Sequence, residues 1–463
     1  MLKKKILACV LVFALLFLTA CGGDAAEKNA EEDVKVFGAT ESKDPLRICV
    51  DLQDFGTSNV GRLHTAMYDF WSTLKNTGKL EDVVIEYIPS PRGMSGDTQD
   101  VSARAAAIDR IRAEIMAGEG PDVFLMTYMV YHGPMGCEYD ETDILFKYPE
   151  KAMANGVFLP LDEYIENNTQ FAEWDKFTKP VMDAGRNEEG QQIIPLTYTF
   201  PLLCYPKSEW EHTPDKSLTW NDLLSDPELS VYGKDLANCS ESFVDFYTKE
   251  ELDGILWHMR YILGKYADYE SEELLFTEEE LLQRVNEILL LDRKDRYTEV
   301  EGACERFAGI RLAQREIDKP TTFLPLYSDD GGIVASIENF AAVNRNTDRP
   351  EDAFTVIDLL MSKHLQQSSA IYTDLLYNKD SIPMHEELFQ ESAPLATSNY
   401  FMTEENFEAF CTVREQLTGA NFEAEWMEML DVLLAHCRNP EPGTTVETYV
   451  HEFYEDMQRR VRE

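Results

Sequence analysis

Strand-like and helix-like segments alternate along the first third of the chain. Segments 46–50, 83–88 and 120–126, the last of which is apolar from Val123 onward, have the length and composition of buried strands. Residues 63–74 and 101–117 separate these runs and repeat apolar side chains at intervals of three and four, which predicts two helices. An order of strand, helix, strand, helix, strand is typical of a parallel sheet with crossover helices. The sequence therefore predicts an α/β fold.

The chain begins with the pattern of an export leader. Lysines at 3–5 precede an apolar run at 6–18, and small residues then lead to Cys21. The run is shorter than the roughly 20 residues of a membrane span, which favours a secretory signal peptide. A cysteine at the cleavage position resembles the lipobox of bacterial lipoproteins, in which the thiol receives a diacylglycerol. We therefore expect residues 1–20 to be removed and Cys21 to carry acyl chains that hold the protein on the outer face of the cell membrane. An ordinary signal peptide with an incidental cysteine is the alternative.

The segment after the expected anchor is strongly acidic. Residues 21–44 are mostly small and polar, which predicts a flexible tether and a folded part that starts near Pro45. The whole chain has a formal net charge of -43 at pH 7, and removal of the three lysines with the leader lowers it to -46. Such a surface repels nucleic acid, which we exclude as a partner, and it disfavours anionic ligands.

No motif in the sequence predicts catalysis or metal binding. The seven cysteines that follow Cys21 are widely spaced and form no C-x-x-C pair. The eight histidines include no H-E-x-x-H pattern, and the G-x-S-x-G and G-x-x-x-x-G-K-[ST] motifs are absent. We therefore expect no metal, no cofactor and no enzymatic activity. A polysaccharide-active enzyme remains as an alternative, because a glycosidase carboxylate pair is defined by its arrangement in space and not by sequence spacing.

Several short stretches carry a resemblance to a known family. They are Gly-Pro-Asp-Val-Phe at 120–124, the segments 156–165, 190–196 and 203–207, Thr-Trp-Asn-Asp-Leu at 219–223, and the segment 347–362. In this order they resemble the extracellular solute-binding proteins of family 1, which are the carbohydrate-binding lipoprotein receptors of ABC importers. Residues 130–144 and 268–317 fit the family pattern poorly.

The resemblance implies a two-lobe periplasmic-binding-protein-like fold of type II, with a ligand cleft between the lobes. Each lobe would be discontinuous in sequence: residues 45–197 with 333–384 form the first, and residues 198–332 with 385–463 form the second. We expect the chain to cross between lobes near 195–201, near 328–332 and near Pro383, where prolines or adjacent glycines occur. Closure of two lobes about such crossings is a known mode of ligand capture.

A receptor of this kind needs polar groups for sugar hydroxyls and aromatic faces for sugar rings, and no catalyst. Candidate ligand-binding residues are the polar and aromatic side chains expected at strand ends, at crossings and in the second lobe: Gln53, Asp54, Tyr128, Tyr198, Phe200, Trp257, Tyr327 and Asp329. Ordinary packing or a solvated loop is the competing interpretation for each of them.

The resemblance implies a monomeric receptor that delivers a carbohydrate, which we expect to be a neutral oligosaccharide, to the permease subunits of an ABC importer. An extracellular sensor that presents its ligand to a membrane kinase or chemoreceptor is the alternative on the same scaffold. Neighbouring permease genes would separate these two functions, and turnover of oligosaccharides would favour an enzyme.

Overall fold

The computed structural model of the chain describes residues 35–38, 42–51, 60–89, 100–127, 144–200, 202–206, 266–290, 320–325, 332–372, 382–391, 403–422, 430, 432–434, 436–437 and 440–462. The signal peptide and Cys21 lie outside these residues. The described helices include none that is long and apolar enough to cross a membrane.

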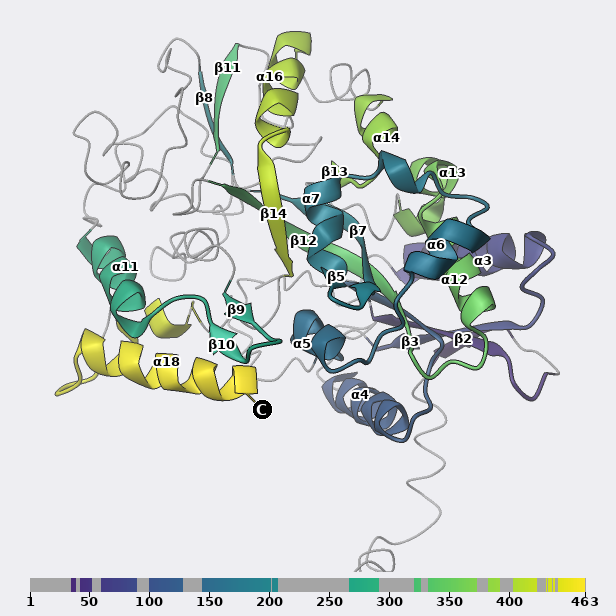
Figure 1. The fold of residues 1–463 in the computed structure, drawn as a ribbon, viewed down its shortest axis with the longest axis horizontal. Helices are drawn as coiled ribbons and strands as arrows, with labels where there is room; N and C mark the ends of the chain where they lie inside the picture. The colour runs from purple at the N-terminus through teal and green to yellow at the C-terminus, as the bar shows by residue number, and fades with distance from the viewer. Residues whose placement is uncertain are drawn as a thin grey trace, which may run out of the picture.

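The centre of the fold is an eight-stranded mixed sheet (Figure 1). Its strands are β1 (Lys35–Phe37), β2 (Leu46–Asp51), β3 (Val83–Ile88), β4 (Val123–Thr127), β7 (Ile193–Thr199), β12 (Ile333–Val343), β13 (Ile382–Pro383) and β14 (Leu417–Phe422). The order is β1-β3-β2-β4-β12-β7-β13, with β14 paired to β12. β2 is parallel to β3 and β4, whereas β12 is antiparallel to β4 and β7. The predicted parallel α/β arrangement of the first three strands is confirmed.

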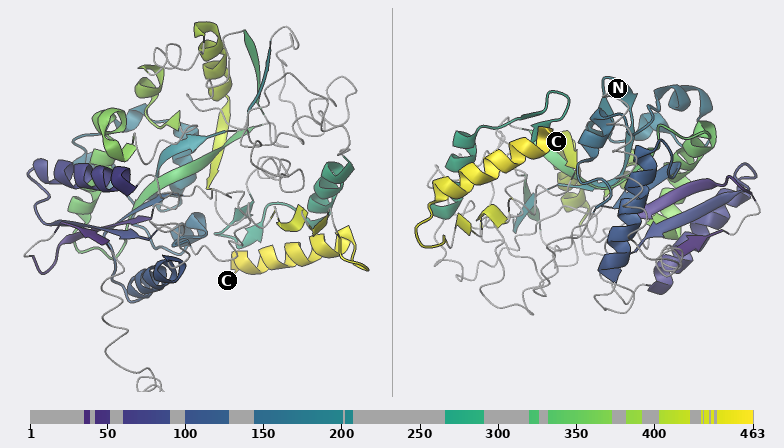
Figure 2. Two further views of the ribbon diagram at one scale, coloured as in Figure 1. Left: turned by 180° about the vertical axis from the view of Figure 1, so that it is seen from behind. Right: turned by 90° about the horizontal axis from the view of Figure 1, so that it is seen from below.

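Two crossover helices join the parallel strands. α3 (Val60–Asn76) links β2 to β3, and α4 (Asp100–Met116) links β3 to β4. Because β3 and β4 flank β2 on opposite sides, right-handed crossovers place these helices on opposite faces of the sheet. Figures 1 and 2 show α3 and α4 on the two sides of β2 and β3. Burial of Phe70 and Leu74 from α3 and of Ile108 from α4 contributes about 1.5–3 kcal/mol for each side chain.

The sheet starts earlier than the sequence predicted. Lys35–Phe37, which the composition placed in the flexible tether, forms β1 and pairs antiparallel with β3. Val36 and Phe37 are apolar residues in a polar segment, and valine and phenylalanine both favour strands.

The chain leaves the central sheet and returns to it through a second, smaller sheet. β7 ends at Thr199, and β8 (Leu202–Pro206) pairs antiparallel with β11 (Thr321–Pro325). β11 is in turn followed by β12, which starts at Ile333. The helix α16 (Glu404–Arg414) packs against β11. This double passage falls at two of the three predicted crossings, and the boundaries of the two lobes stay a prediction.

The remaining elements pack around these two sheets (Figure 1). They are α5 (Pro149–Ala154), α6 (Asp162–Asn168), α7 (Lys179–Met182), α11 (Glu278–Leu290), α12 (Pro350–Leu360), α13 (Lys363–Ser368), α14 (Glu386–Glu391), α18 (Val446–Arg462), the 3-10 turns η2 (Trp174–Lys176) and η3 (Asp183–Gly185), and the strand pairs β5 (Arg186–Asn187) with β6 (Gly190–Gln191) and β9 (Ala267–Asp268) with β10 (Glu273–Leu274). The amphipathic α18 packs against α11 and β10, far from α3 and α12.

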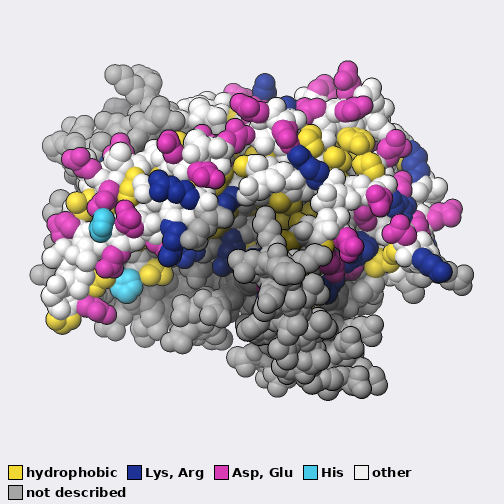
Figure 3. Space-filling view, turned by 60° about the horizontal axis from the view of Figure 1, so that its bottom comes forward, with side chains coloured by type: hydrophobic (Ala, Val, Ile, Leu, Met, Phe, Trp, Pro, Cys, Tyr) yellow, Lys and Arg dark blue, Asp and Glu magenta, His cyan; other side chains and the backbone are white. Residues whose placement is uncertain are grey.

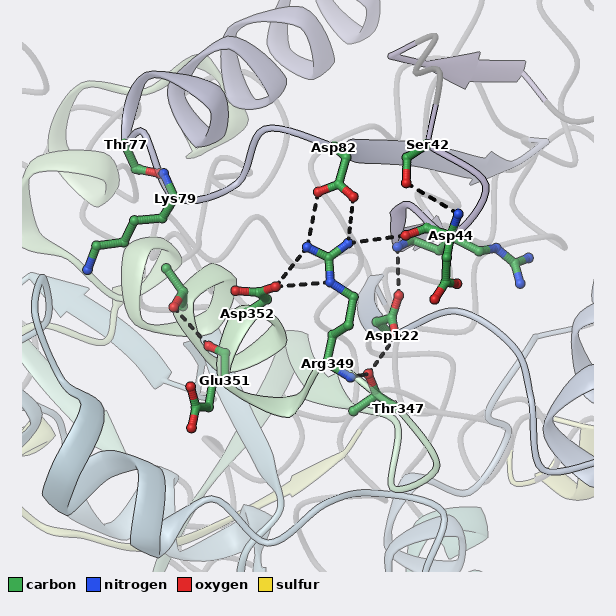
Figure 4. A network of polar contacts seen from close by, with 12 residues as sticks. Ser42, Asp44, Thr77, Lys79, Asp82, Asp122, Thr347, Arg349, Glu351 and Asp352 are labelled. Carbon is green, nitrogen blue, oxygen red and sulfur yellow. Dashed lines mark hydrogen bonds and ion pairs between the residues drawn. The ribbon is translucent and has the colours of Figure 1, made fainter.

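Ion pairs and hydrogen bonds join side chains at the edge of the sheet where the parallel strands begin (Figure 4). The guanidinium of Arg349 donates to both oxygens of Asp82, at 3.0 and 3.1 Å, and to Asp352. Asp122, just before β4, accepts hydrogen bonds from the backbone N–H of Arg47 and from the Thr347 hydroxyl, each below 2.8 Å. Because these charged groups already bond one another, they are not available to bind a ligand at this edge.

Candidate ligand-binding site

The opposite edge of the sheet gathers the carboxyl ends of four strands. β2 ends at Asp51, β3 at Ile88 and β4 at Thr127. β7 is antiparallel to β12, which is antiparallel to β4, so β7 also ends at this edge, at Thr199. In α/β sheets, ligands bind in the crevice outside the carboxyl ends of the strands. The connection to the second sheet starts at this edge and the connection back ends there. We therefore take this edge as the candidate ligand-binding site.

A fully buried ion pair fixes two of these strand ends. Arg104 of α4 donates from Nη1 and Nη2 to the two carboxylate oxygens of Asp51, at 2.7 and 2.9 Å. Nη1 also donates to the carbonyl oxygen of Pro89, which directly follows β3. Both side chains of the pair are 1% exposed. The guanidinium therefore holds the ends of β2 and β3 at a fixed separation.

A second group of polar side chains lies where β7 and β12 run side by side. Thr197 pairs with Asn339 and Thr199 with Ser336 in the antiparallel register. Directly opposite residues project to the same face, as do residues two apart on one strand. The register shifts between Ile337 and Asn339, so Ser336 and Asn339, three residues apart on β12, each lie opposite a threonine of one face of β7. The Asn339 amide donates to the Thr197 hydroxyl. We call these four residues the polar floor; each is at most 4% exposed and none carries a charge.

One atom of the polar floor lacks a protein partner. Thr199 Oγ1 is buried and has no hydrogen-bond partner among the residues that the structure describes. Most buried hydroxyls in proteins are hydrogen-bonded to protein or to water, so the Thr199 hydroxyl retains a donor and an acceptor that a water molecule or a ligand group could use.

On the other face of β7, Tyr198 joins a network of hydrogen bonds and an ion pair centred on Arg414. Tyr198 is fully buried, and its hydroxyl accepts a 2.6 Å hydrogen bond from Arg414 Nε of α16. Arg414 also donates to Glu386 at 2.8 Å and to Thr178 at 2.7 Å. The guanidinium lies 4.1 Å from the centre of the Phe389 ring. Burial raises the pKa of Tyr198, and the charge of Arg414 opposes part of that rise. The network joins β7, α7, α14 and α16 at the start of the crossing.

Two of the predicted ligand-binding residues lie within the described part of the chain. Tyr198 takes part in the Arg414 network, and Phe200 is fully buried and stacked on Phe410, with ring centres 5.6 Å apart and planes 12° apart. Both are therefore engaged by protein groups in this structure. The other predicted residues lie outside the described residues, namely Gln53, Asp54, Tyr128, Trp257, Tyr327 and Asp329. Contact of all eight with a ligand stays a prediction.

The sequence reasoning missed the polar floor and the Asp51–Arg104 pair. The signal for the floor was present as Thr197 and Thr199 in an otherwise apolar run, and as Ser336 and Asn339 in the next long one. The partner of Asp51 lies 53 residues away, so no local pattern announces it. Among the described residues, no group of three or more His, Cys, Asp and Glu side chains is arranged to hold a metal ion.

Comparison with known proteins identifies the fold. No family model matches the sequence, and no curated protein does. Among solved structures, an extracellular solute-binding protein of family 1 from Alicyclobacillus acidocaldarius aligns over 91% of this chain and 100% of its own, with 11% identity and a TM-score of 0.52. A periplasmic oligogalacturonide binding protein from Yersinia enterocolitica aligns over 90% of this chain and 99% of its own, with 12% identity and a TM-score of 0.50.

A third structure, CpMnBP1 with mannotriose bound, aligns over 90% of this chain and 100% of its own, with 11% identity and a TM-score of 0.50. A structure described as a de novo designed esterase matches at a TM-score of 0.50 as well, so likeness at this level defines the fold and not the activity. The chain has the two-lobe α/β fold of the extracellular solute-binding proteins of family 1, as its sequence motifs predicted.

Proposed function

We propose that the protein is a lipid-anchored extracellular solute-binding receptor that delivers a neutral oligosaccharide to an ABC importer. The observation that carries this proposal is the double passage at the carboxyl edge of the central sheet. There, β7 leads out to β8, and β11 leads back to β12, beside the ends of three parallel strands. A ligand bound at this edge contacts both sheets at once, which is how a two-lobe receptor converts binding into closure.

The polar groups described at this edge are suited to binding a saccharide. Two described acidic side chains near this edge are already paired: Asp51 with Arg104, and Glu386 with Arg414. The polar floor contains hydroxyls and an amide, which can hold sugar hydroxyls but are poor general acids or bases. A receptor needs only such groups.

The charge of the protein supports a neutral ligand. Figure 3 shows Asp and Glu side chains scattered over the described part of one face, with Lys and Arg between them. The mature net charge of -46 makes the approach of a polyanion unfavourable, although salt screens this repulsion beyond roughly 8 Å. A neutral oligosaccharide carries no such penalty.

The anchor and the importer complete the proposal. Cys21 would hold the receptor at the outer face of the membrane, where permease subunits are reached by diffusion in two dimensions. Two or three acyl chains anchor durably, because each buried CH2 contributes about 0.8 kcal/mol.

Thermal unfolding of the mature protein, purified from membranes in detergent, tests the proposal. Tryptophan fluorescence would be followed with maltotriose, mannotriose, cellotriose or trigalacturonate present. A true ligand at 100 times its Kd stabilises the fold by about 2.7 kcal/mol. We expect a neutral saccharide to raise the melting temperature and trigalacturonate to leave it unchanged. Release of shorter sugars during incubation would instead identify an enzyme, and uptake that persists without the permease genes would favour the sensor.

A further inference from the structure

The polar floor is unusual for the middle of a sheet. Most neighbouring residues of β7 and β12 are apolar, and Ile194, Leu196, Ile337 and Phe340 are fully buried; β12 also contains the acidic Glu338. Thr197, Thr199, Ser336 and Asn339 replace apolar residues on one face only, beside the end of β7. Burial of polar groups is unfavourable unless their hydrogen bonds are made, so such a cluster in the core requires a compensating role.

One hydrogen bond joins two members of the floor. The Asn339 amide donates to Thr197, which joins the two strands at that point. Two residues further along β7, toward the crossing, Thr199 Oγ1 has no partner among the described residues. The same strand supplies a contrast, because the hydroxyl of Tyr198 on the opposite face has a partner in Arg414 at 2.6 Å.

The chemistry of the floor defines what could complete the bonding of Thr199. A threonine hydroxyl both donates and accepts, and no charged side chain belongs to the floor. The complementary group is therefore a neutral hydroxyl, which can also accept and donate, and not an ammonium or a carboxylate that needs a counter-charge.

We propose that Thr199 is a ligand-binding residue whose hydroxyl hydrogen-bonds a hydroxyl group of a neutral saccharide, and that Thr197 and Asn339 fix the strand beside it. This assignment rests on the proposed function and deepens it, because it names the base of the site and the chemical class of the group that meets it.

The Thr199→Val variant provides the test, since valine has nearly the shape of threonine without the hydroxyl. An orphaned hydroxyl contributes no stability, so the variant without ligand is expected to melt at or above the wild-type temperature. Its Kd for the neutral trisaccharide that binds the wild-type protein, measured by calorimetry, should rise about three- to tenfold. Thr199→Ser keeps the hydroxyl and should retain affinity within about twofold. Thr355→Val on α12 removes a hydroxyl bonded to the Glu351 carbonyl, away from the floor, and should bind as the wild type does.

Three outcomes would overturn the assignment. Equal affinities of wild type and Thr199→Val show that the hydroxyl does not meet the ligand. A lower melting temperature of Thr199→Val without ligand shows that the hydroxyl has a structural partner instead. A wild-type protein that binds none of maltotriose, mannotriose, cellotriose and trigalacturonate removes the proposed function first and this residue assignment with it.

Discussion

Arg104 and Asp51 form a bidentate ion pair that is 99% buried at the carboxyl end of β2. The pair also reaches the end of β3, because Arg104 donates to the Pro89 carbonyl at 3.0 Å. The segments that follow these two strand ends, 52–59 and 90–99, include the predicted ligand-binding residues Gln53 and Asp54. The ion pair thus links the rigid sheet to the part of the chain expected to contact the ligand.

Asp51→Ala is expected to lower the free energy of unfolding by about 3–5 kcal/mol, because it removes the carboxylate that forms a bidentate ion pair with the buried guanidinium of Arg104. Urea denaturation followed by fluorescence measures the loss. Asp82→Ala at the opposite edge is the matched control. Its side chain is 32% exposed and Arg349 keeps Asp352, so the loss there should be about 1 kcal/mol. Similar losses in the two variants would contradict the account.

Tyr198→Phe should lower the free energy of unfolding by about 1.5–3 kcal/mol, since it removes an acceptor from a buried, charged donor. Tyr372→Phe is the control, because Tyr372 is equally buried but donates to the neutral Leu360 carbonyl at 2.9 Å. We expect about 0.5–1.5 kcal/mol there. A larger loss at Tyr372 would show that Arg414 depends on Glu386 and Thr178 rather than on Tyr198.

Glu86 is expected to contribute to acid sensitivity. Burial by itself raises the pKa of Glu86, but the hydrogen bond and charge of Arg47, with the charge of Arg110, hold the pKa below its ordinary value. A carboxylate with a lowered folded-state pKa stabilises the fold above its unfolded pKa of about 4.3, and that stability is lost as the pH falls through the folded-state pKa. Between pH 6 and pH 3, the free energy of unfolding measured by denaturation should therefore fall less steeply for Glu86→Gln than for wild type. Glu163 is exposed, so Glu163→Gln should show the same pH dependence as wild type.

Cys21→Ser should abolish lipid modification, because serine lacks the thiol that would receive the diacylglycerol. Metabolic labelling with a radioactive fatty acid checks this, with the wild-type protein as the labelled control. Label that persists on the variant would show that Cys21 is not the anchor.

Much of the fold could be predicted from the sequence because local patterns fix it. The segments 46–50 and 83–88 became β2 and β3 within a residue, and the helix predicted at 101–117 became α4. The strand predicted at 120–126 became β4, which starts three residues later, at Val123. Each of these elements is encoded by its own periodicity and length. β1 was missed because three residues with two apolar side chains give no periodic signal, and their pairing with β3 depends on a tertiary contact.

The candidate site was harder to predict, for a physical reason. The orphaned state of Thr199 depends on its register with Ser336, 137 positions along the chain, and the burial of Tyr198 depends on Arg414. Neither relationship has a local signature. Aromatic residues at expected crossings were natural candidates for stacking, yet Tyr198 and Phe200 contact residues of α16 in this structure. The small threonine side chain between them attracts less notice in a sequence.

A crystal structure of the mature protein with its tightest neutral trisaccharide tests the central claim most directly. The account predicts difference density for the sugar at the carboxyl edge of the central sheet, with one hydroxyl within 3.2 Å of Thr199 Oγ1. Sugar density at any other edge, or a ligand at this edge that leaves Thr199 Oγ1 without a partner, would contradict it.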